Sequence, residues 1–278
     1  MTEPWREWED PRRVLKRHGL RPKRAYSQNF LVSERAVESI ARAVNLPEGT
    51  QVIELGPGVG TLTSSLARRG WHITAVERDP AMRDVLRQEF GSEGPVEIID
   101  GDAAKVDFAR LGPPPPCTVF GNLPYSITGA IFRNLLGQPG VVKTGVFMVQ
   151  REVRDRLLAS PSTKQYGALS VFVGAAYTVS PVCLVKAGAF FPAPRVDSAV
   201  VRLEHRGEDA IFESESFRAV VSASFQQRRK TLRNALSTLR GSEFATALCA
   251  AASIDSKRRG ETLSVEEFQT LAQALEAS

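Results

Sequence analysis

Between residues 51 and 158, short apolar runs alternate with segments of helical periodicity, and this alternation limits the possible folds more than any other feature. Strands that are separated by helices pair in parallel, and the resulting sheet is covered on both faces. We therefore expect an α/β fold. The expected strands are 51–55, 71–76, 96–99, 117–120 and 146–149, and the expected helices between and after them are 61–69, 80–90, 127–136 and 152–158.

The pattern changes towards the C-terminal end. Two strand-like segments, 177–185 and 198–204, are joined only by a proline-containing loop, which predicts an antiparallel pair at the edge of a mostly parallel sheet. Beyond Gly207 only helical periodicity remains, over 217–225, 231–239, 244–252 and 265–275. We expect a charged leader over 1–25, an α/β domain over 26–206 and a small all-α domain over 207–278.

Composition limits the class of protein. No apolar run has the roughly 20 residues that a membrane-spanning helix needs, and the charged N-terminal segment has no apolar signal core. The three cysteines and three histidines are too scattered for a disulfide framework or a metal site. These features predict a cytoplasmic protein with no metal and no membrane partner. Separately, we expect a monomer. A net charge of +5 permits an anionic partner.

A glycine-rich segment follows the first expected strand. Gly56, Gly58 and Gly60 allow the backbone to turn tightly and approach a ligand, and amides at the following helix start can donate to its polar groups. The G-x-G-x-G spacing differs from the G-x-G-x-x-G that is usual for dinucleotides. The same glycines also fit an ordinary strand-to-helix turn.

Two acidic residues follow the next two strands. Glu77 lies about 20 residues beyond Gly56, where a doubly wound fold sets a carboxylate beside a ribose. Asp102 follows the third strand and is suited to accept from an adenine amine. Together with the glycines, this set resembles the Rossmann-like class I methyltransferases that bind S-adenosylmethionine. The resemblance predicts cofactor contacts at Gly56, Gly58, Glu77 and Asp102.

The segment Asn122-Leu123-Pro124-Tyr125 follows the fourth strand, at the crevice where such sheets hold substrates. An amine on an aromatic ring is a poor nucleophile because its lone pair is delocalised. The Asn122 side-chain oxygen and the Leu123 carbonyl can orient its hydrogens, with Pro124 fixing the backbone and Tyr125 stacking on the base. The segment resembles the (Asn/Asp)-Pro-Pro-Tyr motif of enzymes that methylate amines.

An aromatic pair precedes the last strand, in Phe190-Phe191-Pro-Ala-Pro-Arg-Val-Asp-Ser. We expect the prolines to stiffen this loop and Phe190 to project towards the crevice, where it would sandwich the target base against Tyr125. Phe191 fits a core position better.

Nearly the whole chain resembles the small-subunit ribosomal RNA adenine dimethyltransferases. The matching stretches are Gln28-Asn-Phe-Leu31, 150–157, 166–171, 225–234 and 259–268. The resemblance implies transfer of two methyls from S-adenosylmethionine to the N6 amine of each of two adjacent adenines, in a hairpin loop near the 3′ end of that RNA. It implies action during ribosome biogenesis on a 30S-type assembly intermediate. It also implies cofactor contacts at Asn29, Leu31, Gly56, Glu77, Asp102 and Asn122.

Two residues depart from that family. Ser27 stands where Gly is usual, and Ser126 stands where Asn is common. Ser27 in particular is more typical of the erythromycin-resistance methylases of large-subunit RNA, which therefore remain an alternative. A catalytically silent RNA-binding assembly factor is a second alternative, and a dehydrogenase is a third that the glycine spacing disfavours.

A basic cluster is the expected contact to RNA phosphates. Arg228, Arg229, Lys230 and Arg233 concentrate charge at the start of a C-terminal helix, with Arg229 and Arg233 on one face. A solvated helix face is the alternative interpretation. The basic residues of the leader are candidates for a second RNA-binding arm.

Overall fold

The computed structural model describes residues 7–91, 94–211 and 213–278, and the chain divides into two compact units. Unit 1 comprises Met1–Arg154 with Ser180–His205, and unit 2 comprises Asp155–Val179 with Arg206–Ser278. The division expected from the sequence kept 155–179 with the α/β domain, whereas here that segment belongs with the C-terminal helices. Residues 1–6, the start of the expected leader, lie outside the described residues.

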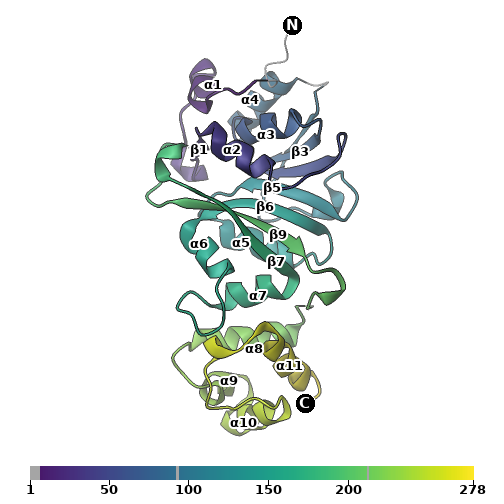
Figure 1. Cartoon of the computed structure of the whole chain (residues 1–278), viewed down its shortest axis with the longest axis vertical. Helices are drawn as coiled ribbons and strands as arrows, with labels where there is room; N and C mark the ends of the chain where they lie inside the picture. Colours follow the sequence, from purple (N-terminus) through teal and green to yellow (C-terminus); the bar gives the residue numbers. More distant parts are fainter. Residues whose placement is uncertain (1–6, 92–93, 212) are drawn as a thin grey trace. The chain divides into compact units, whose positions relative to one another are not determined.

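A seven-stranded sheet forms within the described residues, in the order β4–β3–β2–β5–β6–β9–β7 (Figure 1). Strands β2 to β6 pair in parallel, and β9 joins β6 in antiparallel orientation. The mostly parallel sheet with an antiparallel part is thus confirmed, and β7 and β9 are neighbours at its edge. The bounds are Gln51–Leu55 (β2), His72–Glu77 (β3), Val96–Asp100 (β4), Cys117–Asn122 (β5), Val142–Gln150 (β6), Tyr177–Val185 (β7) and Ser198–His205 (β9).

Helices cover both faces of this sheet, and neighbouring residues of one strand, which point to opposite sides, pack against different helices. On β6, Val146 packs in a core cluster with Val37 of α2 and Leu66 of α3. The adjacent Phe147 meets Phe132 of α5 edge-on, with ring centroids 6.0 Å apart. The helices of this part are α2 (Glu34–Ala41), α3 (Thr61–Ala67), α4 (Pro80–Phe90), α5 (Thr128–Leu136) and α6 (Arg151–Leu157).

Strand β2 lies where the chain order within the sheet reverses, with β3 and β4 on one side and β5 and β6 on the other. Open α/β sheets bind ligands beyond the carboxyl ends of their strands at such a reversal. The register aligns Leu55 with both Val76 and Gly121, so the loops after β2, β3 and β5 begin at one level. These are the loops that carry the predicted site residues.

The N-terminal region folds onto this edge of unit 1. Helix α1 (Pro11–Arg17) starts at an Asp10 cap, and its Val14 packs with Val59 of the glycine-rich loop and with Phe30. The sequence did not predict α1. Arg17 forms ion pairs with Glu9 and Glu89, each at 2.8 Å, so the described part of the leader is anchored to the α/β unit rather than extending from it as a free basic arm.

A second, two-stranded sheet joins the N-terminal region to the loop before β9. Strand β1 (Phe30–Leu31) pairs antiparallel with β8 (Phe190–Phe191), and Leu31 lies opposite Phe190. This pairing was not predicted, because two-residue strands leave no periodic pattern. It fixes which of the two phenylalanines points into the core.

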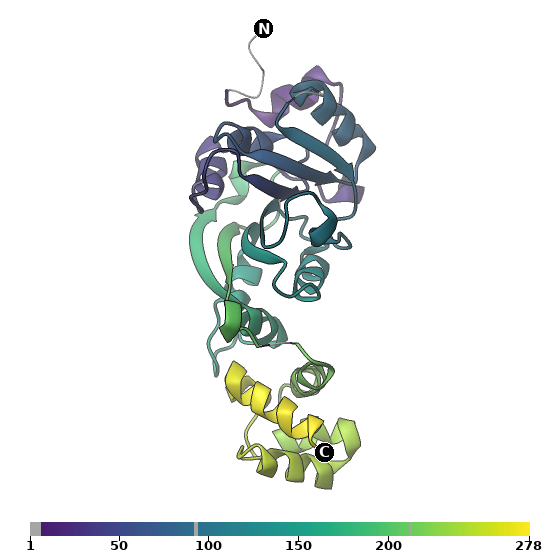
Figure 2. The ribbon, with the colours of Figure 1, turned by 90° about the vertical axis from the view of Figure 1, so that its right-hand side faces the viewer.

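Unit 2 is built from helices (Figure 2). Their buried side chains form one hydrophobic cluster. Its helices are α7 (Ala168–Ala176), α8 (Glu215–Gln226), α9 (Leu232–Arg240), α10 (Ser242–Ala251) and α11 (Val265–Glu276). The last four were expected. Helix α7 was missed because its sequence is apolar almost throughout and lacks a polar face. The Tyr166 hydroxyl donates to the Leu263 carbonyl at 2.9 Å, which ties the segment before α7 to the start of α11. Of the helices in the described ranges, none has the length and apolar character that crossing a membrane requires.

Candidate cofactor and catalytic site

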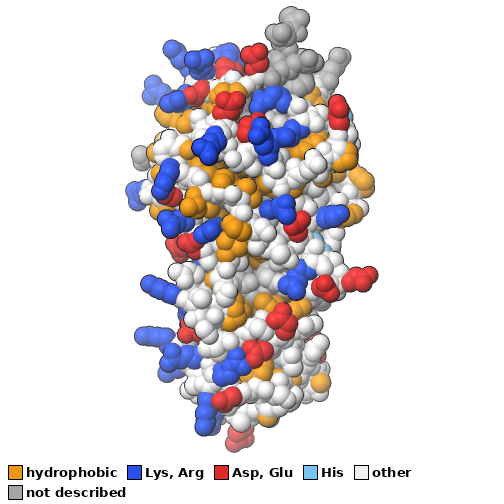
Figure 3. Space-filling model, viewed as in Figure 1, with side chains coloured by type: hydrophobic (Ala, Val, Ile, Leu, Met, Phe, Trp, Pro, Cys, Tyr) orange, Lys and Arg blue, Asp and Glu red, His pale blue; other side chains and the backbone are white. Residues whose placement is uncertain are grey.

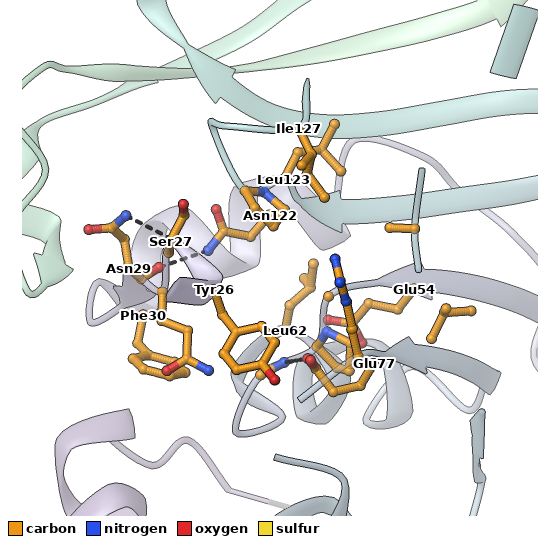
Figure 4. Close-up of a pocket in the computed structure, with 18 of the residues that line it drawn as sticks. Tyr26, Ser27, Asn29, Phe30, Glu54, Leu62, Glu77, Asn122, Leu123 and Ile127 are labelled. Carbon is orange, nitrogen blue, oxygen red and sulfur yellow. Dashed lines mark hydrogen bonds between the residues drawn. The ribbon is translucent and has the colours of Figure 1, made fainter. Parts of the chain in front are cut away.

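A pocket opens at the carboxyl edge of the sheet, within unit 1 (Figure 4). Loops after β2, β3, β4 and β5 contribute to its wall, together with the segment that precedes α2. The structure brings all but one of the expected cofactor-binding and catalytic residues into this wall: Asn29, Leu31, Gly56, Gly58, Glu77, Asp102, Asn122, Leu123, Pro124 and Tyr125. The exception is Phe190.

The glycine-rich loop turns through left-handed backbone conformations that favour glycine. Gly58 has φ +59°, and a Cβ there would lie 2.9 Å from the Phe30 ring. A side chain at this position would therefore displace the aromatic ring that covers the loop. The Gly58 amide donates to Glu77 Oε2 at 3.1 Å, which links the end of β2 to the end of β3.

Glu77 is a buried carboxylate, 8% exposed, on the pocket wall. Its two oxygens accept from the Gly58 amide and, at 2.8 Å, from the Asp79 amide. Burial raises the pKa of Glu77 above its ordinary value, although these backbone donors oppose the rise. Each carboxylate oxygen has a further lone pair, so Glu77 can still accept from a diol in the pocket.

Asp102 lies further along the same edge and is less buried. One oxygen accepts from the Ala104 amide at 3.0 Å, as in a turn, and the other lies 3.4 Å from Arg78 Nη1. The turn role expected for an Asp here is therefore present, and the residue also faces the pocket.

Glu54 is a pocket residue that the sequence analysis did not single out. It is 1% exposed, and its Oε2 has no hydrogen-bond partner among the described residues. Burial raises the pKa of Glu54 to about 8. A carboxylate between the apolar residues Ile53 and Leu55 of a buried strand is the sequence signal that could have marked Glu54. Such a group calls for a cationic or donor ligand.

The catalytic segment begins at the end of β5, where Asn122 Nδ2 donates to the Asn29 carbonyl at 3.1 Å (Figure 4). Because the amide nitrogen is committed, the oxygen Oδ1 is the acceptor that the side chain offers to a ligand. The Leu123 amide donates to Met148 on β6, and the Pro124 carbonyl accepts from Ile127 and Thr128 at the start of α5. The turn of residues 122–126, here called the catalytic turn, is therefore fixed between β5 and α5.

Tyr125 lies on the pocket wall, with its hydroxyl hydrogen-bonded to Ser198 Oγ at the start of β9. Burial raises the pKa of this hydroxyl, so it remains neutral near pH 7. Ser198 is the first residue after the loop that follows Phe190 and Phe191, so the hydroxyl end of the Tyr125 ring is held at the end of that loop. That loop therefore does adjoin the catalytic turn, as expected.

The orientation expected for the two phenylalanines is wrong. Phe190 is 4% exposed and belongs to the core cluster, whereas Phe191 is 39% exposed. The β1–β8 pairing explains the difference, because successive residues of a strand point to opposite faces and Phe190 faces inward beside Leu31. Phe191 is the ring that this loop presents to solvent.

The segment of residues 23–29, here called the strap, crosses the pocket from the N-terminal side. Lys23 Nζ and Gln28 Nε2 each contact a different oxygen of the fully buried Asp79 at 2.9 Å. Tyr26 projects from the strap into the pocket towards Glu77 (Figure 4). No pattern in the sequence marked Tyr26 as a pocket residue.

In unit 2, the basic cluster divides into two kinds of residue. Arg228 pairs with Glu261 at 2.7 Å and donates to the carbonyls of Thr163 and Lys164, so it serves internal contacts. Arg229, Lys230 and Arg233 are exposed. Helix α9 begins at Leu232, which means that only Arg233 of these lies on it and the expected shared helix face with Arg229 is wrong.

Basic side chains also occur elsewhere. In Figure 3, Lys and Arg side chains are spread over the visible face of each unit and interspersed with acidic ones. Among the described residues, no group of three or more His, Cys, Asp or Glu is arranged to hold a metal ion.

Comparison with curated proteins gives close relatives over nearly the whole chain. The ribosomal RNA small subunit methyltransferase A of Myxococcus xanthus is 45% identical over 272 residues, which cover 96% of this chain and 95% of the relative. The protein of the same name from Moorella thermoacetica is 40% identical, covering 95% of this chain and 96% of the relative.

Two solved structures are similar in fold. A dimethyladenosine transferase from Plasmodium falciparum matches with a TM-score of 0.72 at 22% identity, over 87% of this chain and 95% of that one. The 23S rRNA methyltransferase ErmE matches with a TM-score of 0.65 at 27% identity, over 89% of this chain and all of that one. A family model described as ribosomal RNA adenine dimethylase matches residues 19–277. With the relatives above, this match shows that the chain belongs to the ribosomal RNA adenine dimethylase family.

Proposed function

We propose that this chain transfers methyl groups from S-adenosylmethionine to the N6 amines of two adjacent adenines in a 3′-end hairpin loop of small-subunit ribosomal RNA. The observation that carries the proposal is Asn122, whose amide is oriented by the Asn29 carbonyl at the edge of a pocket that also holds Glu77. The Myxococcus xanthus relative, which is named for the small-subunit activity, is 45% identical, compared with 27% for ErmE, and this favours the small-subunit substrate over the large-subunit alternative.

The residues of the pocket fit S-adenosylmethionine. That cofactor carries an ammonium, a ribose diol and an adenine amine, and the pocket offers one carboxylate suited to each. The orphaned Oε2 of Glu54 suits the ammonium, Glu77 suits the diol and Asp102 suits the amine. Gly56 and Gly58 let the backbone approach the cofactor closely, and Leu31 supplies an apolar contact.

When bound, the cofactor supplies a methyl group that its sulfonium already activates. The protein then has to orient the adenine amine and exclude water, which positioned acceptors can do without a strong base. In this proposal Asn122 Oδ1 and the Leu123 carbonyl accept the two amine hydrogens. Pro124 fixes the backbone directly after the Leu123 carbonyl, and the Tyr125 ring stacks on the base while Ser198 holds its hydroxyl.

Contacts to the rest of the RNA would come from both units. The exposed Arg229, Lys230 and Arg233 are suited to phosphates, while exposed Phe191 is suited to stack on an unpaired base. The role first expected for Phe190 would require its ring to leave the core. The proposed partner is small-subunit RNA in a 30S-type assembly intermediate, met by a monomeric enzyme in the cytoplasm.

Incubation with labelled S-adenosylmethionine and separately purified, unmethylated small and large subunits tests the proposal. We expect label only in the small subunit, as dimethylated adenines in one hairpin loop. Label in the large subunit would establish the erythromycin-resistance type of activity instead. Absence of label in both, with no rise in Tm on adding the cofactor, would identify a silent assembly factor.

A further inference from the structure

The strap forms hydrogen bonds with both ends of the catalytic turn, at Asn122 and at Ser126. Asn29 receives the Asn122 amide through its carbonyl, 3.1 Å away. Ser27 Oγ lies 2.9 Å from Ser126 Oγ, the hydroxyl that directly follows Tyr125. Within the strap, Asn29 Nδ2 donates to the Ser27 carbonyl at 3.1 Å, which joins the two contact points (Figure 4). Two hydrogen bonds from the strap therefore hold the turn that carries the proposed acceptors.

The backbone of Ser27 has a conformation that favours glycine, although the residue is a serine. Ser27 has φ +51°, a left-handed conformation that costs a serine more than it costs a glycine. Glycine would satisfy the backbone better, but it cannot form the bond to Ser126. The hydroxyl is therefore the feature that a serine contributes at this position.

On its other side, the strap is anchored to Asp79, next to Glu77 of the pocket wall. Gln28 Nε2 donates to Asp79 Oδ2, and the Asp79 amide donates to Glu77 Oε1. Hydrogen bonds therefore connect Glu77 to Asp79 and Asp79 to Gln28, and the covalent backbone of the strap joins Gln28 to the residues that contact the catalytic turn. Any ligand that contacts Glu77 and Tyr26 would stabilise the strap in this position.

We propose that Ser27 and Ser126 are positioning residues whose hydrogen bond holds the strap on the catalytic turn, so that the Asn29 carbonyl keeps the Asn122 amide in its reactive orientation. The pair touches neither the transferred methyl nor the base in this scheme. Through this hydrogen bond, a cofactor that stabilises the strap also fixes the orientation of the Asn122 side chain. The inference rests on the proposed function, because it assigns these residues a part in that reaction.

Four variants test the pair: Ser27→Gly, Ser126→Ala, the double variant, and Ser126→Thr, which keeps a hydroxyl. Ser27→Gly is the sharpest, because it removes the hydroxyl and relaxes the backbone at once. We expect Tm to stay level or rise while kcat falls about three- to tenfold, the effect of losing one neutral hydrogen bond. The KM for S-adenosylmethionine should change less than kcat. The double variant should be no worse than either single one, and Ser126→Thr should retain activity.

A second measurement does not depend on turnover. Hydrogen exchange of a peptide covering 23–31 should slow when S-adenosylhomocysteine is added to the wild-type protein, and this protection should be reduced in Ser27→Gly and Ser126→Ala. Ser39→Ala is the matched control, because its hydroxyl donates to the Arg35 carbonyl of its own helix turn and also contacts Cys183, and both partners lie outside the strap and the catalytic turn.

The outcomes separate the two proposals. Wild-type kcat and wild-type protection in both single variants would overturn the positioning role, as would a Ser126→Thr variant that behaves like Ser126→Ala. If instead the wild-type protein labels neither subunit, the proposed function itself fails. The exchange measurement then still reports whether the pair orders the strap.

Discussion

Asn122 and Asn29, which lie 93 residues apart in the sequence, meet through a hydrogen bond from the Asn122 side-chain nitrogen to the Asn29 carbonyl. The bond leaves Oδ1 as the end of the Asn122 amide that would face a substrate in the proposed mechanism. An amide that could flip would present a donor to an amine half of the time, and a donor there would repel the amine hydrogens. The N-terminal segment therefore orients a side chain at the end of β5.

This relationship predicts a graded response at position 122. Asn122→Ala removes the acceptor, and we expect kcat to fall on the order of 100-fold or more, by analogy with the loss of a preorganised polar group. Asn122→Asp keeps an acceptor but loses the donor to Asn29, so its kcat should lie between those of Ala and wild type. Steady-state kinetics with cofactor affinity measured by calorimetry checks both. Near-normal turnover in Asn122→Ala would remove Asn122 from the mechanism.

The buried Glu54 predicts a pH dependence. Burial raises its pKa in the folded protein to about 8, from an unfolded value near 4.5. The folded state therefore binds the extra proton between these values, so its stabilising contribution is complete below about pH 4.5 and is lost as the pH rises through 8. We expect the free energy of unfolding to fall with pH across this window in the wild type, and to fall less in Glu54→Gln. Denaturant titrations at several pH values measure this; parallel curves for the two proteins would contradict it.

The same carboxyl predicts a proton release on ligand binding. If its partner is the cofactor ammonium, binding must ionise Glu54, so affinity should rise with pH up to about 8 and then level off. Calorimetry in buffers of different ionisation enthalpy counts the released protons. Glu54→Gln should release fewer protons and bind more weakly. An unchanged proton count in the variant would assign the titration to another group.

The two phenylalanines before β9 should respond differently to truncation. Phe190→Ala opens a cavity in the core and should cost about 3–5 kcal/mol of stability. Phe191→Ala should leave Tm nearly unchanged and weaken RNA binding, since an exposed ring that stacks on a base contributes about 1–3 kcal/mol. Thermal unfolding and filter binding to the hairpin RNA distinguish them. A stable Phe190→Ala protein with weak RNA binding would restore the stacking role first expected for Phe190.

The basic cluster predicts a salt dependence smaller than its four charges suggest. With Arg228 committed to Glu261, three exposed cations remain, and each phosphate contact contributes about −0.7 to the slope of log affinity against log salt. Replacing Arg229, Lys230 and Arg233 with Ala should flatten the slope by about 2. Arg228→Ala serves as the comparison, since it should cost about 1–2 kcal/mol of stability and change the slope little. A triple variant with the wild-type slope would show that the RNA docks elsewhere.

The parts of the site that could be predicted are those fixed by local pattern and chain order. Glu77, Asp102 and Asn122 each follow an apolar strand, and parallel strands bring their carboxyl ends to one edge regardless of side-chain detail. Glu54 carried the same kind of signal, a charge inside an apolar strand. It was missed because the adjacent glycines account for the segment by themselves.

The parts that could not be predicted depend on pairings between distant segments. Whether Phe190 or Phe191 faces the core depends on the β1–β8 register, which two-residue strands do not reveal. Likewise, the sequence does not show that Arg228 forms an ion pair, because its partner Glu261 lies 33 residues further along the chain. Ser27 and Ser126 were noticed only as departures from a family pattern, and nothing local indicates that they meet.

The strap also has a consequence for biosynthesis. Its residues leave the ribosome early, but their partners follow much later: Asp79 is 51 residues beyond Gln28, and Ser126 is 99 residues beyond Ser27. Asp79 is available to Lys23 and Gln28 as soon as α4 begins, but until β5 and the turn after it have been translated, Ser27 and Asn29 lack their partners Ser126 and Asn122. The strap is therefore translated first but reaches its final position in the pocket wall last. A nascent chain that ends before α5 lacks the complete cofactor pocket.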